Sequence, residues 1–545
     1  MNRRDLLAQL RRQHFDLLII GGGIVGAGIA RDAAIRGLKV ALIEQDDFAG
    51  GTSSKTSKLI HGGLRYLAHG HVRLVMESLR ERHILRTIAP ALVHPRSMLL
   101  PVYQDAARSA WQIHLGLWLY DLLALRRNIR PHRMLSALGA LALEPHLRAD
   151  GLRTAGLYAD CQMDDARLCL ANILQAVGFG AVCCNYVRLR AFLKSRQHLV
   201  GGVGEDLFTG LTMEIQARVV INATGPWSDA LRRTSEQAAT PRLAPTKGIH
   251  LIVPPLTHEA LFVEARRDRR MFFLLPWGEY SLIGTTETPV SGALEALSAT
   301  ADEVDYLLEE TNRVIPGRGL KAEEIIATYA GARPLLSSAN PSTNASREHR
   351  IEIDRWGLVS VMGGKYTTYR LMAQQVLDLV MRRYGWRADR CLTDQVSLLE
   401  TTQPIMAERW RAVTRDLDPD LLTRLITRYG AGTFHVLALV EGTPSLAQPV
   451  CPHHELILAE LAYALQHELA CTITDVLARR TRIAFSPCQG LDLLSSLSVL
   501  IAQQTPMPIP SLAHQIEAYH QFLARSLAFR TSDGAAISAG THDGT

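Results

Sequence analysis

The stretch Phe15–Glu44 constrains the fold more than any other part of the chain, and it reads FDLLIIGGGIVGAGIARDAAIRGLKVALIE. Its apolar start has the composition of a buried parallel strand, and a second apolar run, Leu38–Ile43, closes it. Between them, a G-x-G-x-x-G turn leads into a helical pattern over Ala27–Arg36, and Gly37 follows at the usual position of a helix C-cap glycine. The stretch therefore predicts a strand, a helix and a second strand.

The three glycines of the turn, Gly21, Gly23 and Gly26, each remove a side chain from a crowded position. The first permits a tight turn, the second lets the backbone approach a pyrophosphate, and the third allows the helix to pack closely on the strand. The N–H groups at the start of the helix then face the phosphates. Glu44 stands where an acid commonly meets the hydroxyl groups of a ribose. The unit predicts dinucleotide binding but does not separate FAD from NAD.

The composition is typical of a globular protein of two to four domains. The chain has 545 residues, of which 47% are apolar and 21% charged, with a formal net charge of +6. This mild basic excess suits an anionic substrate or an anionic membrane surface. No basic tract with interleaved aromatic residues is present, so we expect no nucleic-acid partner.

The eight cysteines are scattered along the chain, and none of them forms a C-x-x-C pair. Cys183 and Cys184 are merely adjacent. This usage is typical of a reducing compartment. We therefore expect no disulfide framework, no zinc site and no other bound metal.

Lysine is rare in this chain. Only seven of the 59 basic residues are lysine, and three of these, Lys58, Lys247 and Lys365, stand beside glycines or Ser/Thr clusters. Where arginine is the default cation, a position that keeps lysine is a candidate for a specific role. We expect at least one of the three to belong to a functional site.

Two segments have the pattern of helices that contact lipid. Met1–His14 carries Leu6, Leu7 and Leu10 on one helical face among arginines, which is typical of either a membrane-surface helix or a frayed terminus. Ile113–Leu125 is strongly apolar but too short to span a membrane. We expect it to be a core or dimer helix, with an interfacial membrane helix as the alternative.

Strand patterns stop beyond about residue 385. Leu421–Tyr429, His454–His467 and Cys471–Ala478 have helical patterns, which predict a separate helical domain. From about Arg530 the chain lacks the apolar residues of a core, so we expect a disordered tail over 530–545.

Two segments in the middle of the chain favour a flavin as the cofactor. A predicted strand over Arg218–Ala223 runs into Thr224 and Gly225. Such a strand end is common where a second strand of the sheet returns beneath a bound dinucleotide. A later strand ends at Gly363-Gly364 and is followed by a helix, which brings another helix N-terminus to the same crevice. The positive end of such a helix stabilises the electron-rich edge of a reduced flavin. A domain that binds only NAD needs neither segment.

Six motifs, taken in order, carry a resemblance to a known family. They are TSSKTSKLIHGGLRYL from Thr52, ATGPW from Ala223, KGIH from Lys247, PWGEYSLIGTTE from Pro276, GARPL from Gly331 and GGKYTTYR from Gly363. In their order and spacing over roughly 15–370, the chain resembles the aerobic, FAD-dependent glycerol-3-phosphate dehydrogenases. Ile249 and Glu287 depart from the family pattern, in which a serine and an aspartate are familiar.

The resemblance implies an activity and a location. The activity is the oxidation of sn-glycerol 3-phosphate to dihydroxyacetone phosphate by hydride transfer from C2 to FAD, with electrons passed to a membrane quinone. The location is peripheral, on the cytoplasmic face of the inner membrane, and we expect a homodimer.

We expect an α/β fold in which a Rossmann-like FAD-binding domain is discontinuous. This domain takes residues 15–95, 150–240 and 330–384, and it follows a basic lead-in over 1–14. A mixed-sheet substrate or cap domain, 96–149 and 241–329, is inserted in it. A helical C-terminal domain over 385–529 completes the chain.

The residues expected to bind FAD come from the glycine-rich turn, from the first motif and from the later segments. They are Gly21, Gly23, Gly26, Glu44, Thr52, Ser53, Ser54, Lys58, Leu59, His61, Gly62, Gly63, Ala223, Gly225, Trp227, Lys247, Gly364, Lys365 and Thr367.

Oxidation of a phosphorylated secondary alcohol needs a proton acceptor and a cationic grip on the phosphate. A guanidinium group matches phosphate oxygens bidentately, which favours Arg333 and Arg65 for the grip. His61 is our candidate base, because an imidazole pKa of about 6.5 suits proton transfer near neutrality. The alternative is that His61 only orients the flavin. The expected catalytic residues are His61, Arg333 and Lys365, and the expected substrate ligands are Arg65, Tyr66, Arg333, Lys365 and Thr367.

Three other functions share the same dinucleotide motif. An oxidase of this fold passes its electrons to oxygen, and an amine or amino-acid oxidase binds a carboxylate in place of a phosphate. A non-catalytic flavoprotein keeps the FAD contacts and loses the substrate residues. The presence of Arg65, Arg333 and Lys365 argues against the last of these.

Overall fold

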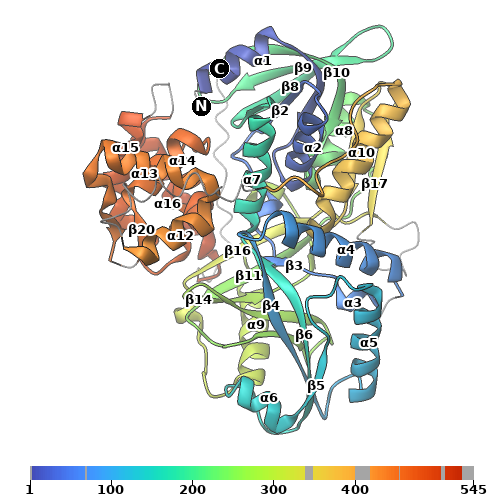
Figure 1. The fold of residues 1–545 in the computed structure, drawn as a ribbon, viewed down its shortest axis with the longest axis vertical. Helices are drawn as coiled ribbons and strands as arrows, with labels where there is room; N and C mark the ends of the chain where they lie inside the picture. Colours follow the sequence, from blue (N-terminus) through green and yellow to red (C-terminus); the bar gives the residue numbers. More distant parts are fainter. Residues whose placement is uncertain are drawn as a thin grey trace.

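The protein is described by a computed structural model that covers residues 3–67, 70–337, 348–398, 418–452, 454–504 and 510–530. These residues form three regions (Figure 1): an α/β region at the top, a second sheet with its helices at the bottom, and a group of C-terminal helices at the side. The expected disordered tail lies outside the described residues except for Arg530.

The first sheet is built around β1 (His14–Ile20), which pairs in parallel with β2 (Val40–Ile43) and with β10 (Thr212–Asn222). Its strand order is β17-β18-β10-β1-β2-β7, and the β8–β9 hairpin extends it beside β10. The continuous apolar run of β1 is explained by burial on both faces of the sheet. The other strands are β7 (Val182–Cys184), β8 (Val187–Lys194), β9 (Leu199–Asp206), β17 (His349–Ile353) and β18 (Val359–Gly363).

Helix α2 (Ile24–Ile35) follows β1 and contacts both α7 (Asp165–Gly178) and α10 (Tyr369–Tyr384). Helix α7 begins where the side chain of Asp164 accepts a hydrogen bond from the N–H of Arg167. Helix α8 (Ser228–Ser235) completes this region, and α4 (Val72–Ile88) lies between it and the second sheet, since its buried residues belong to the cores of both. The three segments of chain expected to build one dinucleotide-binding unit therefore meet around α2.

The basic lead-in is a helix packed on the first region. In α1 (Arg3–Arg12), Leu6 and Leu10 are buried in the core shared with the first sheet. The buried guanidinium of Arg3 donates to the Asp206 carboxylate at 2.6 Å. Over Arg3–Arg12 both expectations, a membrane-surface helix and a frayed terminus, are wrong, because the leucine face is buried against the protein itself.

The second sheet has the strand order β15-β11-β14-β13-β12-β4-β6-β3, with β16 paired to β11 and β5 paired to β6. Two of its strands, β3 (Leu59–Ile60) and β6 (Leu152–Met163), fall in residue ranges that we expected in the FAD-binding domain. The long β4–β6 pairing carries them into this sheet. The other strands are β4 (Val93–Tyr103), β5 (Arg133–Ser136), β11 (Thr246–Val253), β12 (Ala260–Glu264), β13 (Met271–Trp277), β14 (Tyr280–Gly284), β15 (Thr288–Pro289) and β16 (Ala327–Arg333).

Four helices flank the second sheet: α3 (Leu64–Leu67), α5 (Ala110–Leu123), α6 (Ala137–Leu143) and α9 (Ala301–Val314). Helix α9 begins with a capping box formed by Thr300 and Glu303. Figure 1 places α5 and α6 at the end of the molecule farthest from α1.

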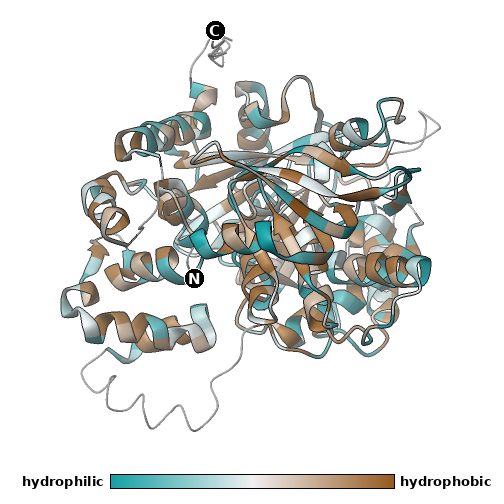
Figure 2. Cartoon of the chain, turned by 90° about the horizontal axis from the view of Figure 1, so that it is seen from above, coloured by the Kyte–Doolittle hydropathy of each residue, from teal (hydrophilic) through white to brown (hydrophobic). Residues whose placement is uncertain are grey.

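The C-terminal region is mainly helical, and its helices carry both hydrophilic and hydrophobic residues (Figure 2). The expected helix over His454–His467 is wrong in its first turn, because His454–Ile457 is strand β20, paired with β19 (Pro449–Cys451). The segment expected as a helix from Cys471 forms a π-helical turn, Asp475–Arg480. The α-helices are α12 (Pro419–Tyr429), α13 (Thr433–Gly442), α14 (Leu458–His467), α15 (Leu494–Gln504) and α16 (Leu512–Ser526).

A buried ionic cluster joins the C-terminal region to the loop after β2. The Asp47 carboxylate accepts hydrogen bonds from Arg479 Nε at 2.5 Å and from Arg480 at 2.6 and 2.9 Å. Burial by itself raises the pKa of Asp47, but the two guanidinium groups outweigh it and lower the pKa to about 2. The contribution of Asp47 to stability is therefore complete above its unfolded pKa of about 3.9 and is lost as the pH falls towards 2.

We predict that Asp47→Ala lowers the free energy of unfolding by about 3–5 kcal/mol, because it leaves buried arginines without their shared carboxylate. Chemical denaturation of the holoenzyme measures this loss. Glu77→Ala is the matched control, since Glu77 pairs with an Arg73 side chain that is 91% exposed. Breaking that surface pair should cost less than about 1 kcal/mol. Equal effects of the two substitutions would contradict the prediction.

Candidate active site

A cavity of about 950 Å³ lies where the three regions meet. Its lining includes the turn after β1, the loop after β2, the end of β16, the turn after β18, and Phe485 and Phe522 of the C-terminal region. The volume is at the upper end of the range for small-molecule and cofactor sites. The expected site residues that line it are Gly21, Gly23, Glu44, Thr52, Ser53, Ser54, Leu59, His61, Ala223, Gly225, Trp227, Arg333, Gly364, Lys365 and Thr367.

The turn between β1 and α2 has the close packing that its glycines predict. A Cβ atom built on Gly26 would lie 1.9 Å from the carbonyl oxygen of Gly21, so no side chain fits there. Gly26 itself does not line the cavity and acts through this packing. The N–H of Ile24, at the start of α2, donates to Ser53 Oγ at 2.9 Å. The turn thus presents backbone at the cavity wall.

Glu44 directly follows β2 at the same wall. One carboxylate oxygen accepts from the N–H of Gly22 at 2.6 Å, and the other accepts from the N–H of Asp46 at 2.9 Å. Burial raises the pKa of Glu44 to about 7, although these two hydrogen bonds oppose the rise. The carboxylate therefore changes its charge near neutral pH.

The later segments meet the first motif across the cavity. Lys365, which follows the β18 strand, donates from Nζ to the carbonyl oxygen of His61. Thr367 Oγ1 lies 3.3 Å from both the N and the O atom of His61. Thr52 Oγ1 donates to the carbonyl of Ala332 at 2.6 Å, and the indole of Trp227 donates to Glu295. The contacts of Lys365, Thr367 and Thr52 join segments that are 280 to 306 residues apart in the sequence.

Arg333, at the end of β16, supplies a cation to the cavity wall. Its guanidinium donates to Thr285 Oγ1 at 2.8 Å and to the carbonyl of Thr286 at 3.1 Å. These bonds hold the planar group in one orientation, as bidentate binding of an anion requires.

Several expected site residues lie elsewhere. Lys58 is buried in an ion pair with Asp165 at 2.5 Å, and Lys247 pairs with Glu303 at 2.8 Å. Arg65 lies 3.8 Å from Glu287. The remaining three, Gly62, Gly63 and Tyr66, are outside the lining; Gly62 donates to Asp160, and the Tyr66 ring lies 5.4 Å from Lys365 Nζ.

His250 lines the cavity and was not among the expected site residues. Its Nε2 lies 2.8 Å from Ser57 Oγ, and its ring stacks on Tyr329 at 4.9 Å. Burial lowers the pKa of His250 well below its ordinary value, and the nearby Arg333 and Lys58 lower it further. The imidazole is therefore neutral at neutral pH. A polar residue inside the buried strand GIHLIV is the signal that sequence reasoning passed over.

The two imidazoles belong to one face of the second sheet. His250 pairs in register with Gly284, and Gly284 pairs in register with Phe273. Residues in register on neighbouring strands share a face, and His61 packs edge-on against Phe273 at 6.1 Å. His61 and His250 are thus presented to the cavity from the same side.

Lys55 is a second residue missed by the sequence analysis. It lines the cavity, and burial lowers its pKa. Its carbonyl and Cβ lie against Gly331, where a Cβ atom would be 2.9 Å from the Lys55 oxygen. Only the fold, which lays the first motif along β16, brings these two together.

We predict that FAD, the expected cofactor, binds more tightly as the pH rises towards 7 and that Glu44→Gln removes this dependence. Ribose hydroxyls donate to the ionised carboxylate, so binding favours its unprotonated form. Losing a hydrogen bond to a charged group costs about 1.5–3 kcal/mol, which weakens binding by roughly tenfold or more. Titration of the apoprotein with FAD, followed by flavin fluorescence on both sides of pH 7, measures both effects.

Glu77→Gln, outside the cavity, is the control for that titration and should bind FAD like the unsubstituted protein. A Glu44→Gln protein that keeps the original pH profile would remove Glu44 from the ribose site.

Comparison with known proteins agrees with this geometry. The model of the FAD dependent oxidoreductase family matches residues 16–370, and the model described as the C-terminal domain of alpha-glycerophosphate oxidase matches residues 391–506. Glycerol-3-phosphate dehydrogenase of Synechocystis is 36% identical over 95% of this chain and 98% of its own length. Aerobic glycerol-3-phosphate dehydrogenase of Bacillus subtilis is 35% identical over 88% of this chain and 89% of its own length.

Solved structures of other proteins share this fold. The glycerol-3-phosphate dehydrogenase of Bacillus halodurans, complexed with FAD, is 28% identical, has a TM-score of 0.81 and covers 97% of this chain and 99% of its own. Glycine oxidase from Geobacillus kaustophilus shares the fold at 22% identity and a TM-score of 0.54, over 72% of this chain and 100% of its own.

The cavity fits the cofactor of this family. The turn lines the cavity with Gly21 and Gly23, the positions at which such a turn meets a pyrophosphate, and Glu44 follows the second strand at the place of a ribose. The two family models together match most of the chain, and residues from both matched ranges line the cavity. The chain therefore belongs to the FAD dependent oxidoreductase family and, within it, to the glycerol-3-phosphate dehydrogenases.

Proposed function

We propose that the protein oxidises sn-glycerol 3-phosphate to dihydroxyacetone phosphate and that its electrons pass to a membrane quinone. The observation that carries the substrate is the pair of cationic groups, Arg333 and Lys365, on the wall of the FAD cavity. The relatives named above support the same substrate through their names. Bound FAD supplies a hydride acceptor for C2 of the substrate.

The phosphate grip rests on Arg333. Its guanidinium is half-buried and oriented by Thr285 and Thr286, so little freedom remains to be lost when a phosphate binds. Lys365 and Thr367 line the same cavity and contact the backbone of His61. Arg65, paired with Glu287 outside the lining, is a weaker candidate that requires a side-chain movement to reach the phosphate.

The proton of the substrate hydroxyl needs an acceptor at the same wall. We propose His61, which lines the cavity and is anchored through its backbone by Thr367 and Lys365. His250 is the alternative, because its neutral imidazole also lines the cavity. The pH profiles of flavin reduction in His61→Asn and His250→Asn decide between them. The rate of flavin reduction rises with pH as the base loses its proton, and this rise should disappear only in the variant that lacks the base.

An oxidase that uses oxygen is the second candidate. The name of the family model that matches residues 391–506 favours it, whereas the relatives matched over most of their length are named dehydrogenases. An amino-acid oxidase shares only the fold, at 22% identity for the glycine oxidase. The electron acceptor and the substrate class are therefore the quantities to measure.

We predict that glycerol 3-phosphate bleaches the flavin of the anaerobic holoenzyme and that Arg333→Ala raises the half-saturating substrate concentration about 10- to 150-fold. This range corresponds to the loss of one charged hydrogen-bond contact, about 1.5–3 kcal/mol. Stopped-flow absorbance of the flavin measures it. The reduced enzyme should then be reoxidised by a short-chain quinone faster than by dissolved oxygen.

Arg318→Ala is the control, because Arg318 pairs at the surface with Glu324 at 3.1 Å, away from the cavity. Unchanged saturation in Arg333→Ala would exclude Arg333 from the grip. Bleaching by glycine but not by glycerol 3-phosphate would refute the substrate, and stoichiometric peroxide formation in air would favour the oxidase.

The membrane contact is proposed to lie on α5. Its outer face exposes large apolar side chains at helical spacing, whereas Leu117 and Tyr120 on the inner face are fully buried. Arg126 and Arg127, both exposed, follow the helix. The exposed fractions of the outer face are 66% for Trp111, 54% for Leu115, 54% for Trp118 and 52% for Leu122.

This face combines tryptophans, leucines and flanking arginines, which is the pattern of a helix lying in the interface of an anionic membrane. Leu138, which is 80% exposed, belongs to α6, a helix at the same end of the molecule (Figure 1). Within the described ranges, no helix combines the length and the hydropathy needed to cross a bilayer. We therefore propose peripheral attachment to the cytoplasmic face of the inner membrane, where a lipid-soluble quinone is within reach.

We predict that the double substitution Trp111→Glu with Trp118→Glu lowers binding to phosphatidylglycerol-containing vesicles by on the order of 100-fold. Each buried tryptophan contributes about 1.5–3 kcal/mol, or roughly tenfold or more. Vesicle co-sedimentation measures the change, and flavin reduction in solution should stay normal.

Leu211→Glu is the matched control, because Leu211 is 64% exposed but lies between β9 and β10, remote from α5. Equal vesicle binding by all three proteins would refute the proposal. A dimer in the unsubstituted protein that dissociates in the tryptophan variant would instead identify the outer face of α5 as the homodimer interface.

A further inference from the structure

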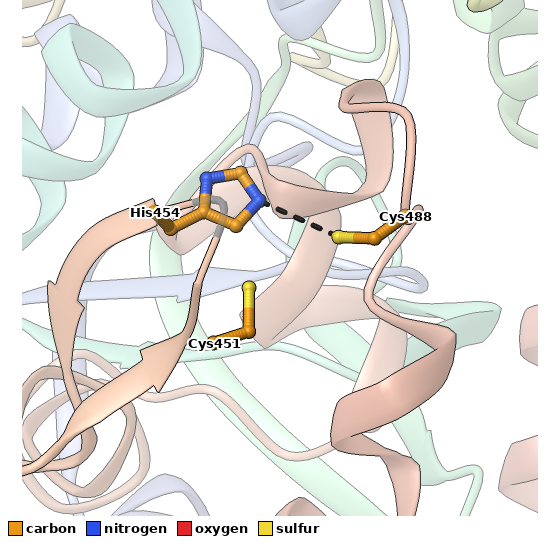
Figure 3. Close-up of side chains that lie close together, drawn as sticks. All are labelled: Cys451, His454 and Cys488. Carbon is orange, nitrogen blue, oxygen red and sulfur yellow. Dashed lines mark hydrogen bonds between the residues drawn. The ribbon is translucent and has the colours of Figure 1, made fainter.

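Two cysteines and a histidine converge in the C-terminal region, outside the FAD cavity. The ligand atoms of Cys451, His454 and Cys488 all lie within 4.8 Å of one another. Figure 3 shows the imidazole of His454 and the thiol of Cys488 directed at each other, with the Cys451 sulfur pointing into the same space. His454 Nε2 lies 3.7 Å from Cys488 Sγ.

The fold explains why these three meet. Cys451 ends β19 and His454 begins β20, and the two are paired in register, so their side chains project from the same face of the hairpin. Cys488 comes from a turn more than thirty residues later, in which its carbonyl accepts from the N–H of Leu491. No metal was expected from the sequence, because it contains no C-x-x-C pair, whereas this cluster combines C-x-x-H with a distant cysteine.

The spacing is close to that of a tetrahedral zinc centre. Zn–S bonds of about 2.3 Å and Zn–N bonds of about 2.0–2.1 Å set the sulfur–sulfur distance at roughly 3.8 Å and the sulfur–nitrogen distance at roughly 3.6 Å. The observed separation of 3.7 Å between His454 Nε2 and Cys488 Sγ already meets the second value. The widest separation between two of the three ligand atoms is at most 4.8 Å, so a contraction of about 1 Å brings all three to the distances of a tetrahedral zinc centre.

The chemistry of the donors selects the metal. Thiolate and imidazole ligands favour zinc over the hard cations Ca²⁺ and Mg²⁺. Two thiolates neutralise the charge of Zn²⁺, so the complex is neutral in a site where Cys451 is only 7% exposed. The Ser486 hydroxyl lies 3.0 Å from His454 Nε2 and 3.3 Å from Cys488 Sγ, which gives the site a polar fourth side for a coordinated water.

We propose that Cys451, His454 and Cys488 form a zinc site. Binding of Zn²⁺ releases the two thiol protons, and no oxidation or reduction is involved. None of the eight cysteines, all of which lie in the described ranges, is in a disulfide, so both thiols are in the state that binds metal.

The site has a structural consequence for the enzyme. The zinc ion ties the β19–β20 hairpin to the segment that carries Phe485, three residues before Cys488. Phe485 lines the FAD cavity and packs against Trp277 and Tyr329 of the second sheet. The metal therefore stabilises the wall that the C-terminal region contributes to the cavity, at a distance from the reacting atoms.

Metal analysis of the holoenzyme tests the proposal. The untagged protein, purified under reducing conditions and without chelators, should contain a stoichiometric amount of zinc by mass spectrometry. Cys488→Ser and Cys451→Ser should each reduce the zinc content at least tenfold. Cys391→Ser is the matched control, because Cys391 is half-buried but lies outside the cluster, and it should keep its zinc.

A second measurement needs no variant and remains decisive if the cysteine variants fail to fold. Co²⁺ is added to the zinc-depleted holoenzyme with its thiols reduced and its flavin oxidised. It should produce the intense d–d bands of tetrahedral thiolate coordination, which lie at longer wavelength than the bands of oxidised flavin. Zn²⁺ should abolish these bands. Zinc-free native protein that shows no such bands with Co²⁺ would overturn the proposal, and so would a Cys451–Cys488 disulfide in protein alkylated before lysis.

Discussion

The contact between Gly26 and the carbonyl oxygen of Gly21 is the constraint on which the active site depends. A Cβ atom at residue 26 would lie 1.9 Å from that oxygen, so the chain can bring α2 this close to β1 only through glycine. Helices α7 and α10 both pack on α2. A shift of α2 would therefore move the backbone that meets a pyrophosphate and also the helix that follows Lys365.

The cavity is held together by polar contacts between distant segments. Lys365 binds the carbonyl of His61, and Thr52 binds the carbonyl of Ala332, so each wall is positioned by another. Asp47 joins the C-terminal region to the cavity by accepting hydrogen bonds from Arg479 and Arg480. Because these groups are buried or half-buried, a lost partner is costly, and the walls keep one arrangement around the flavin.

Regular elements with a strong hydrophobic period could be predicted well from the sequence. The strand–helix–strand unit predicted at Phe15–Glu44 is present as β1, α2 and β2. The β20 strand was mistaken for helix because a four-residue strand leads directly into α14, and short apolar runs have no distinct period.

The candidate site was predictable only in part, and the lysines show why. Lys365 does line the cavity, but Lys58 pairs with Asp165 and Lys247 pairs with Glu303. The local sequence around all three is similar in its glycines and hydroxyls, so it does not reveal which amine finds an acidic partner. His250 was missed for the converse reason, since its partners Ser57 and Tyr329 are 193 and 79 residues away in sequence.

By itself, the sequence determined the phosphate-binding turn, the use of a flavin and the family, because those depend on short motifs whose glycines and acid act on their own backbone. Only the tertiary structure decided which cations face the cavity, which face of α5 stays exposed and that Cys451, His454 and Cys488 come together. Those outcomes depend on side chains from separate segments, and packing alone chooses which of them become neighbours.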